Sequence, residues 1–360
     1  MINKELIKRN YSLLYVFYVV IASVVMVLIS VQLNSNLKSN SISNNITNQI
    51  SETIVEKTVN FLLPAMIVSE TSANLMNAGV LQSNQIKLIE KTIINFIKPH
   101  SQLSNFYYAD LEGNFVMVSK KSNILTETRI QNSNKPNSMT VFQRNQSGNL
   151  ISTKKETSNF DARKRPWFIG AVESKQQYWT NLYVFHSKKH PGITASFPVF
   201  DKKNVVIGVF GVDIELESLS KFLDSQLEQN ATTIIILDEE NNIVAKPGEA
   251  SFTTTIDGSI KPLSIDQLNN KLISKAIALQ EKKNKPNFNF KHDQDLYYAS
   301  IQTFPKQFGK KWSILTVVTP SNLISNSIFS FGFILTILSG IVLVSIASYM
   351  ALHKYIMPLD

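Results

Sequence analysis

Two stretches of the 360-residue sequence are apolar and free of charged side chains, residues 10–37 and residues 312–352. Within them, residues 13–33 and 328–352 are each long enough for a helix that crosses a bilayer, which takes about 20 residues. Neither run shows the polar face expected of a helix that packs on a core. A cleavable signal peptide would have a shorter apolar region and a small-residue cleavage site, so the first run is interpreted as an uncleaved anchor.

Basic residues flank these two apolar runs on their outer sides. Three precede the first run and two follow the second: Lys4, Lys8, Arg9, His353 and Lys354. Because positive residues collect on the cytoplasmic side of a membrane, we expect both ends in the cytoplasm and residues 34–326 outside. The wealth of Asn, Lys, Ile and Ser is typical of a bacterial sequence, which predicts a location in the inner membrane.

Between the two runs the pattern is first helical. Apolar residues recur mostly at steps of three to five over residues 37–63, which is the period of an amphipathic helix. Pro64 is expected to kink or interrupt this helix, which resumes over residues 65–76. A second helix is predicted over residues 83–97. Residues 34–100 are therefore interpreted as a long helical stalk.

After residue 100 the apolar residues gather in short alternating runs separated by turn residues, the pattern of β-strands. A hairpin is predicted over residues 106–118, with its turn at residues 110–114. A helix is expected to begin near Pro166, since proline suits the first helical position. The other predicted elements are strands near 139–143, 149–153, 178–184, 193–200 and 205–212 and a helix over 215–227.

A smaller unit then repeats this outline. Residues 233–237 form an apolar strand that leads through an acidic, Asn-rich turn into a strand at 243–247. It is completed by a helix near 265–280 and strands near 288–291, 297–302 and 312–318. The sequence therefore predicts an α+β fold with two tandem antiparallel-sheet units on a long N-terminal helix, flanked by two transmembrane helices. The predicted segments are 1–12 (cytoplasmic), 13–33 (first span), 34–100 (stalk), 101–228 and 229–325 (the two units), 328–352 (second span) and 353–360 (cytoplasmic).

Composition argues against several classes of protein. Cysteine is absent, which rules out disulfides, a thiolate nucleophile and zinc–thiolate sites. The net charge of +9 comes from short scattered clusters, so no nucleic-acid partner is expected. His186 and His190 lack a nearby carboxylate, and residues 238–242 lack the spacing of a calcium loop, so no metal is expected. No Gly-rich phosphate loop or nucleophile elbow appears, so we expect neither a cofactor nor enzyme activity.

Residues 160–213 combine the charged and aromatic side chains that could hold a small zwitterion. Arg165 can pair with a carboxylate through two parallel hydrogen bonds, and Asp213 can accept hydrogen bonds from an ammonium group. Four aromatic residues would form the walls: Phe160, Trp167, Phe168 and Tyr183. Two other interpretations stay open, because Arg165 could lie across a structural Trp167, and Asp213 could stabilise the N-terminus of the following helix.

These residues resemble a known family of bacterial receptor domains. Three motifs are similar, in order, to the membrane-distal module of double Cache (dCache) sensor domains: residues 161–168, 193–199 and 208–214. Residues 232–247 resemble the smaller, membrane-proximal module, and residues 356–359 resemble the start of a HAMP linker. The resemblance covers residues 36–325 and implies two PAS-like modules in tandem.

In family members that bind amino acids, the motif positions for Arg, Trp, a later Tyr and Asp correspond to Arg165, Trp167, Tyr183 and Asp213. Two further positions of the motif are tyrosines in those members and phenylalanines here: Phe160 and Phe168. A lost tyrosine hydroxyl that bonds a ligand weakens binding by about 1 kcal/mol. The departures therefore favour a less polar ligand, or weaker binding of a full amino acid.

The resemblance implies extracytoplasmic sensing of a small molecule (an amino acid, an amine or a related compound) and signal transduction across the membrane. It also implies a homodimer, and an output module such as a histidine kinase, a chemotaxis signalling rod or a nucleotide cyclase. Two alternatives are a membrane-tethered extracytoplasmic enzyme, for which the sequence offers no nucleophile, and a structural membrane protein with a vestigial pocket.

Overall fold

The computed structural model describes residues 45–319, apart from 123–124, 136, 146, 188, 231–232, 249–251, 255–259 and 284, together with Ile21 and Gly340. The chain divides into two compact units, and nearly all the described residues belong to the unit formed by residues 47–319. The predicted membrane spans and cytoplasmic ends lie outside the described residues, except for Ile21 and Gly340. Among the helices that are described, none is long and apolar enough to cross a membrane.

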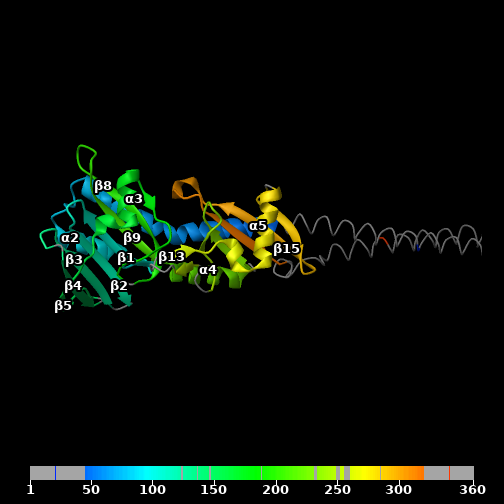
Figure 1. Cartoon of the computed structure of the whole chain (residues 1–360), viewed down its shortest axis with the longest axis horizontal. Helices are drawn as coiled ribbons and strands as arrows, with labels where there is room; N and C mark the ends of the chain where they lie inside the picture. The colour runs from blue at the N-terminus through cyan, green and yellow to red at the C-terminus, as the bar shows by residue number, and fades with distance from the viewer. Residues whose placement is uncertain are drawn as a thin grey trace, which may run out of the picture. The chain divides into compact units, whose positions relative to one another are not determined.

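A long helix, residues 45–77, lies along the unit (blue in Figure 1). The side chain of Asn48 accepts a hydrogen bond from Gln302, and that of Asn77 accepts one from the main-chain N–H of Phe200. The helix continues through Pro64, so the predicted interruption is wrong. Proline removes one main-chain hydrogen bond, but Leu62 and Ala65 on either side are fully buried, and this packing holds the helix together.

The first sheet has nine antiparallel strands in the order β5-β4-β3-β2-β1-β9-β8-β6, with β7 paired to β8. The strands are β1 (Leu103–Asp110), β2 (Phe115–Ser122), β3 (Leu125–Gln131), β4 (Ser138–Asn145), β5 (Leu150–Thr157), β6 (Tyr178–Trp179), β7 (Tyr183–Val184), β8 (Pro191–Phe200) and β9 (Val206–Glu215). Helix α2 (Ile86–Ile97) packs against β1 and β2, and helix α3 (Pro166–Ser174) packs against β6, β8 and β9. The predicted hairpin of β1 and β2, the predicted strands β4 and β5, and helix α3 are confirmed, whereas β3 was not predicted.

The predicted strand at 178–184 is divided into β6 and β7. Thr180, between them, breaks the regular ladder with its side chain. The Thr180 hydroxyl accepts a hydrogen bond from the main-chain N–H of Thr194 at 2.9 Å, in the place of a main-chain acceptor. The Thr180 N–H in turn donates to the Thr194 carbonyl at 3.0 Å.

The second sheet has five antiparallel strands in the order β11-β10-β16-β15-β14. Its strands are β10 (Thr233–Leu237), β11 (Ile243–Ala245), β14 (Asn287–His292), β15 (Asp295–Thr303) and β16 (Ser313–Val318). Helix α4 (Leu216–Asn230) connects the two sheets in the chain, helix α5 (Lys271–Lys283) packs on β14, and β12 (Phe252–Thr254) pairs with β13 (Ile260–Pro262) in a separate hairpin that was not predicted. The predicted α+β fold with two antiparallel-sheet modules and a long N-terminal helix is confirmed.

The first hairpin of each sheet has the same kind of turn. In the first, Asn114 donates its main-chain N–H and its side-chain amide to the Asp110 carboxylate at 2.9 and 2.7 Å. In the second, Asn242 donates to Asp238 in the same way, at 2.7 and 3.0 Å. Asp and Asn side chains stabilise turns by such local hydrogen bonds. The acidic segment at 238–242 is therefore a hairpin turn whose first carboxylate is occupied by its own loop.

Candidate ligand-binding site

The local chain fixes the position of Arg165. A short 3₁₀ turn (Ala162–Lys164) is capped by Asp161, whose carboxylate accepts the Arg163 N–H at 3.1 Å. Pro166 then opens α3, and a proline pushes the preceding residue out of the helical region. Arg165 accordingly has an extended backbone, with φ −92° and ψ 145°, at the N-cap position.

Asp213 lies inside β9, between two polar cross-strand neighbours. It pairs with Asn105 on β1 and with Thr194 on β8. The Asn105 amide donates to Oδ2 of Asp213 at 2.7 Å, and the Thr194 hydroxyl donates to Oδ1 at 2.6 Å. The carboxylate is therefore held by the sheet, and not by the N-terminus of α4, which was the alternative interpretation of Asp213.

Tyr107 is a third donor to Asp213, and sequence reasoning missed it. Its hydroxyl donates a short hydrogen bond to Oδ1 of Asp213. The tyrosine ring reaches the carboxylate by lying across Gly211, its cross-strand partner on β9. A Cβ at Gly211 would come within 2.2 Å of the Tyr107 ring, so the position requires glycine. The alternation of β1 places Asn105 and Tyr107 on one face, and this could have been read from the sequence.

Tyr183 extends this network by one more hydroxyl. Its hydroxyl lies 2.7 Å from the Thr194 hydroxyl. Because Thr194 gives its proton to Asp213, the proton between the two hydroxyls comes from Tyr183. Burial raises the pKa of both Tyr107 and Tyr183, which keeps both hydroxyls protonated donors.

The pKa of Asp213 is raised from its ordinary 3.8 to about 6. Burial is the largest cause, and it outweighs the hydrogen bonds from Thr194, Tyr107 and Asn105, which lower the pKa. A carboxylate removed from water in this way gains much from a positively charged ligand group, because the charge replaces lost hydration.

Arg165 lines the cavity and is half-buried. Its Nη2 donates to the Val184 carbonyl at 3.0 Å, and its guanidinium lies over the Tyr183 ring, 5.5 Å from the centroid. Within the described residues no carboxylate pairs with Arg165. Trp167 is buried and packs on Tyr107, with ring centroids 4.6 Å apart.

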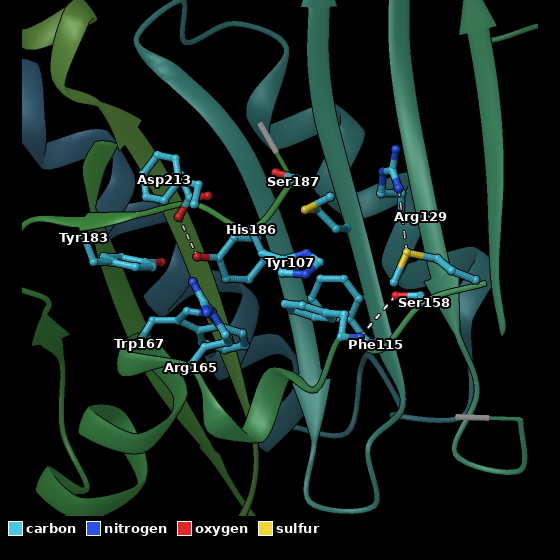
Figure 2. A pocket seen from close by; sticks show the side chains of 14 residues that line it. Tyr107, Phe115, Arg129, Ser158, Arg165, Trp167, Tyr183, His186, Ser187 and Asp213 are labelled. Atoms are coloured by element: carbon cyan, nitrogen blue, oxygen red, sulfur yellow. Dashed lines mark hydrogen bonds between the residues drawn. The ribbon is translucent and has the colours of Figure 1, made fainter. Parts of the chain in front are cut away.

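These side chains open onto one cavity of about 60 Å³ (Figure 2). Since one water needs some 10–15 Å³ by this measure, the space holds about four to six waters, or a small organic molecule. Five of the six predicted site residues line it: Phe160, Arg165, Trp167, Tyr183 and Asp213. Phe168 does not line the cavity. It lies on α3 with its side chain buried in the core, and its ring is edge-on to that of Trp167.

The rest of the lining was not predicted. Tyr107, Phe115 and Met117 come from β1 and β2, Arg129 and Met139 come from β3 and β4, and Ser158, Phe185, His186 and Ser187 come from loops or strand ends. His186 packs against Phe160 with ring centroids 4.9 Å apart, whereas His190 lies 3.3 Å from Glu215. Across the described part of the chain, no three His, Asp or Glu side chains gather as metal ligands.

Comparison with known proteins shows the family. The family model dCache_1, described as a Cache domain, matches residues 28–328. The chain therefore belongs to the Cache domain family. A search of curated proteins gave no match.

Solved structures of bacterial chemoreceptor domains share the fold. The ligand-binding domain of Pseudomonas fluorescens CtaA in complex with L-isoleucine is 14% identical, with a TM-score of 0.50 over 80% of this chain and 96% of that chain. The same domain with L-alanine is 15% identical, with a TM-score of 0.50 over 78% and 99%. The Campylobacter jejuni Tlp3 domain with 4-methylisoleucine is 16% identical, with a TM-score of 0.48 over 81% and 96%.

Proposed function

We propose that this protein is the sensory part of a bacterial transmembrane receptor, which binds a small zwitterion such as an amino acid in the pocket between Arg165 and Asp213. One observation carries the proposal. The Arg165 guanidinium, which pairs with no carboxylate among the described residues, and the buried Asp213 carboxylate line the same small cavity. A ligand with a carboxylate at one end and an ammonium group at the other satisfies both.

The chemistry of the two ends favours this ligand class. Arg165 offers a planar set of donors to the ligand carboxylate. Asp213, with Tyr107 and Thr194 fixed around it, offers an acceptor to the ammonium group. Phe168 does not line the cavity, so only the phenylalanine at position 160 takes the place of a pocket tyrosine. The CtaA domain, with the same fold, is described in complexes with L-isoleucine and L-alanine, which supports an amino acid.

The topology of the proposed receptor follows from the apolar runs. Residues 13–33 and 328–352 cross the inner membrane, the Cache modules lie outside, and both ends are cytoplasmic. The units at 101–228 and 229–325 are the membrane-distal and membrane-proximal modules. The receptor is a homodimer with parallel long helices. Ligand binding shifts an equilibrium between two conformations, typically by about 1–3 kcal/mol. The change in conformation reaches the second span through β16.

Calorimetry with the purified full chain tests the proposal. We expect saturable binding of at least one L-amino acid from a panel that also contains amines, purines and organic acids. Arg165→Gln and Asp213→Asn should each abolish it, because each leaves one charged end of the ligand buried without a partner. Turnover of a panel compound would indicate an enzyme instead.

Arg163→Gln is the matched control. Arg163 lies two residues from Arg165, but it is exposed and pairs with Asp161 at 2.9 Å outside the cavity. Its loss should leave the affinity unchanged. A panel that is silent with the folded wild-type chain would contradict the proposal and favour a vestigial pocket.

A further inference from the structure

The cavity continues beyond the zwitterion end towards the strands β2, β3 and β4. Three of its residues stand directly opposite one another on neighbouring strands, because Tyr107 pairs with Met117 and Met117 pairs with Arg129. They form one row across the sheet, which starts at Gly211 beside Asp213. Figure 2 shows Asp213, Tyr183 and Arg165 towards one end and Arg129 towards the other.

This row is too long for the head group of an amino acid alone. From β9 to β3 there are three strand spacings of about 4.8 Å, or roughly 14 Å in all. An α-amino group and an α-carboxylate are only about 3 Å apart, and two hydrogen bonds add about 2.8 Å each. The side chain of the ligand must therefore occupy the space over Met117 and towards Arg129.

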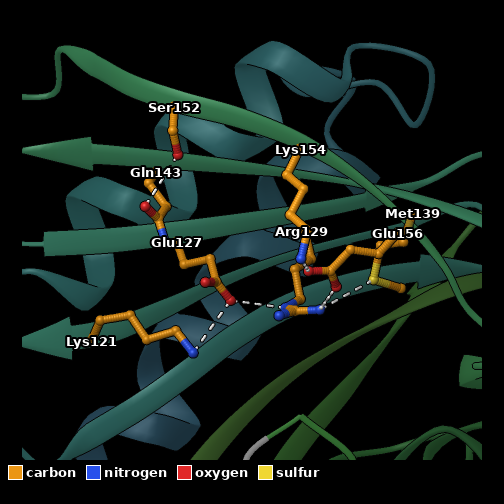
Figure 3. Close-up of polar contacts among 8 residues, drawn as sticks. All are labelled: Lys121, Glu127, Arg129, Met139, Gln143, Ser152, Lys154 and Glu156. Carbon is orange, nitrogen blue, oxygen red and sulfur yellow. Dashed lines mark hydrogen bonds and ion pairs between the residues drawn. The ribbon is translucent and has the colours of Figure 1, made fainter.

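Arg129 is held in a network of ion pairs (Figure 3). Its Nε donates to Glu127 at 2.9 Å, and its Nη1 donates to Glu156 at 3.1 Å. Nη1 also lies 3.9 Å from the Met139 sulfur. A guanidinium carries five N–H donors, and the two on Nη2 have no hydrogen-bond partner among the described residues.

The network contains more positive than negative charge. Glu127 is shared with Lys121 at 3.3 Å, and Glu156 is shared with Lys154 at 3.1 Å. Three cations therefore surround two carboxylates. Of these five residues, only Arg129 lines the cavity.

The same positive field acts on His186 at the cavity wall. The pKa of His186 is lowered, first by burial and then by Lys189, Arg165 and Arg129. His186 is therefore neutral at pH 7 and adds no charge of its own. The lining residues consequently carry two guanidiniums, Arg129 and Arg165, against the single carboxylate of Asp213.

We propose that Arg129 determines ligand specificity by accepting a second anionic group, so that the pocket prefers a dicarboxylic amino acid to its neutral isostere. The inference rests on the proposed function, because the zwitterion end must hold the α-amino and α-carboxylate groups. Met117, Met139, Phe115 and Phe160 surround the methylene groups of the ligand, and Nη2 of Arg129 binds its terminal carboxylate. Glu127 and Glu156 are positioning residues that hold the guanidinium.

L-Glutamate and L-glutamine test this proposal, since they differ by one charged group and have nearly the same shape. A charge-assisted hydrogen bond contributes about twice as much as a neutral one, so glutamate should bind the full wild-type chain roughly 5- to 10-fold more tightly. Equal or tighter binding of glutamine overturns the proposal without any variant. Glutarate, which lacks the amino group, should bind much more weakly than glutamate.

Arg129→Gln should bring the affinities for the two ligands within about 2-fold of each other, and Arg129→Lys should retain part of the preference because it keeps the charge. Arg144→Gln is the matched control. Arg144 lies on the next strand, has a similar side-chain exposure (22% against 21%), and pairs with Glu90 at 3.0 Å outside the cavity. A glutamate preference that survives in folded Arg129→Gln also overturns the proposal.

The two proposals fail in different ways. If the zwitterion site is wrong, Arg165→Gln binds both ligands as the wild type does, or wild type binds no amino acid. If only the specificity inference is wrong, Arg165→Gln abolishes binding, while Arg129→Gln leaves the ratio of the glutamate and glutamine affinities as it is in the wild type.

Discussion

At the scale of single residues, the site is organised around one buried carboxylate. Asp213 receives hydrogen bonds from Asn105, Tyr107 and Thr194, and yet burial still raises its pKa to about 6. In the absence of ligand, ionisation of Asp213 is therefore less favourable than it would be in water. If the site binds an ammonium group, this free-energy cost of ionisation is expected, because the positive charge of the ligand offsets it and so contributes to affinity.

Asp213→Asn should stabilise the ligand-free protein at neutral pH. The folded-state pKa is raised from 3.8 to about 6, so the folded chain binds the proton more tightly than the unfolded chain does. Stability from this group is full below about pH 4 and is lost as the pH rises through about 6, at a cost of roughly 3 kcal/mol at pH 7. Asparagine lacks this titration. Its amide can also donate to Oδ1 of Asn105, which has no partner in the described part of the chain, if the Asn105 side chain flips.

Denaturant unfolding at pH 4 and pH 7 measures the difference. The variant should match wild type at pH 4 and exceed it by up to about 3 kcal/mol at pH 7. Asp201→Asn, in a surface turn where Asp201 accepts the main-chain N–H groups of Lys203 and Val205, is the control. A variant that is less stable than wild type at pH 7 would show that the hydrogen bonds outweigh burial.

Gly211→Ala should weaken ligand binding without touching a ligand. The added Cβ would lie 2.2 Å from the Tyr107 ring and push it away from Asp213. Asp213 would lose a donor that lowers its pKa, so a smaller share of the carboxyl groups would be ionised at pH 7. We expect affinity for a cationic group to fall by up to about 10-fold, and stability to fall by about 1–3 kcal/mol from overpacking. Tyr107→Phe should reproduce the loss of affinity without the overpacking. Unchanged affinity in Gly211→Ala would mean that the hydrogen bond from Tyr107 to Asp213 does not contribute to ligand binding.

The sequence predicted the two charged residues proposed to hold the zwitterion, but not the strand residues that line the rest of the cavity. Arg165 and Asp213 belong to motifs that are local in the chain, and their chemistry can be read from the residue types. Tyr107 and Arg129 enter the cavity only through strand register. That register depends on pairings between segments up to about a hundred residues apart, which no local pattern specifies.

At the scale of elements, most strands were predictable, but the polar strand β3 was not. The hairpin at 106–118 was found because two runs of apolar residues flank a turn that contains Asp and Asn. Strand β3 reads Leu-Thr-Glu-Thr-Arg-Ile-Gln, with polar residues on both faces. Its Thr128 and Glu127 are buried all the same, and Glu127 is paired with Lys121 and Arg129. Tertiary packing thus overrides the local pattern there.

Pro64→Ala tests the same principle in the long helix. Proline inside a helix costs about 3 kcal/mol relative to alanine, and residues 45–77 remain helical through it. The substitution should therefore stabilise the chain by about 1–3 kcal/mol, measured as the free energy of unfolding in denaturant. Ser69→Ala in the same helix, where the hydroxyl bonds to Met66 O at 2.9 Å, should not stabilise it. A loss of stability in Pro64→Ala would mean that a proline bend is needed for packing on both sheets.

At the scale of the whole described unit, the two sheets are joined at a small aromatic cluster. Trp179 on β6 stacks on Phe308 with ring centroids 4.9 Å apart, and Phe304 and Trp312 complete the cluster. Lys310 adds a hydrogen bond to Asn181 at 2.9 Å. Thr180, the residue next to Trp179, bonds to Thr194, which bonds to Asp213. Contacts thus run from the candidate site to the segment that leads into β16.

Trp179→Leu should uncouple the two sheets. In the wild type the shared cluster favours cooperative unfolding of both sheets, because Trp179 is fully buried between them. Leucine cannot fill the indole space, and the substitution should cost about 2–4 kcal/mol and separate the unfolding into two transitions. Hydrogen exchange of the amides in β10 and β16, with and without a bound amino acid, should then lose its dependence on the ligand.

Phe288→Leu, in the core of the five-stranded sheet, should destabilise that sheet but keep the ligand dependence. A variant of Trp179 that still transmits ligand protection to β16 would leave the long helix, which contacts Gln302 and Thr316 through Asn48 and Ser51, as the route between the sheets.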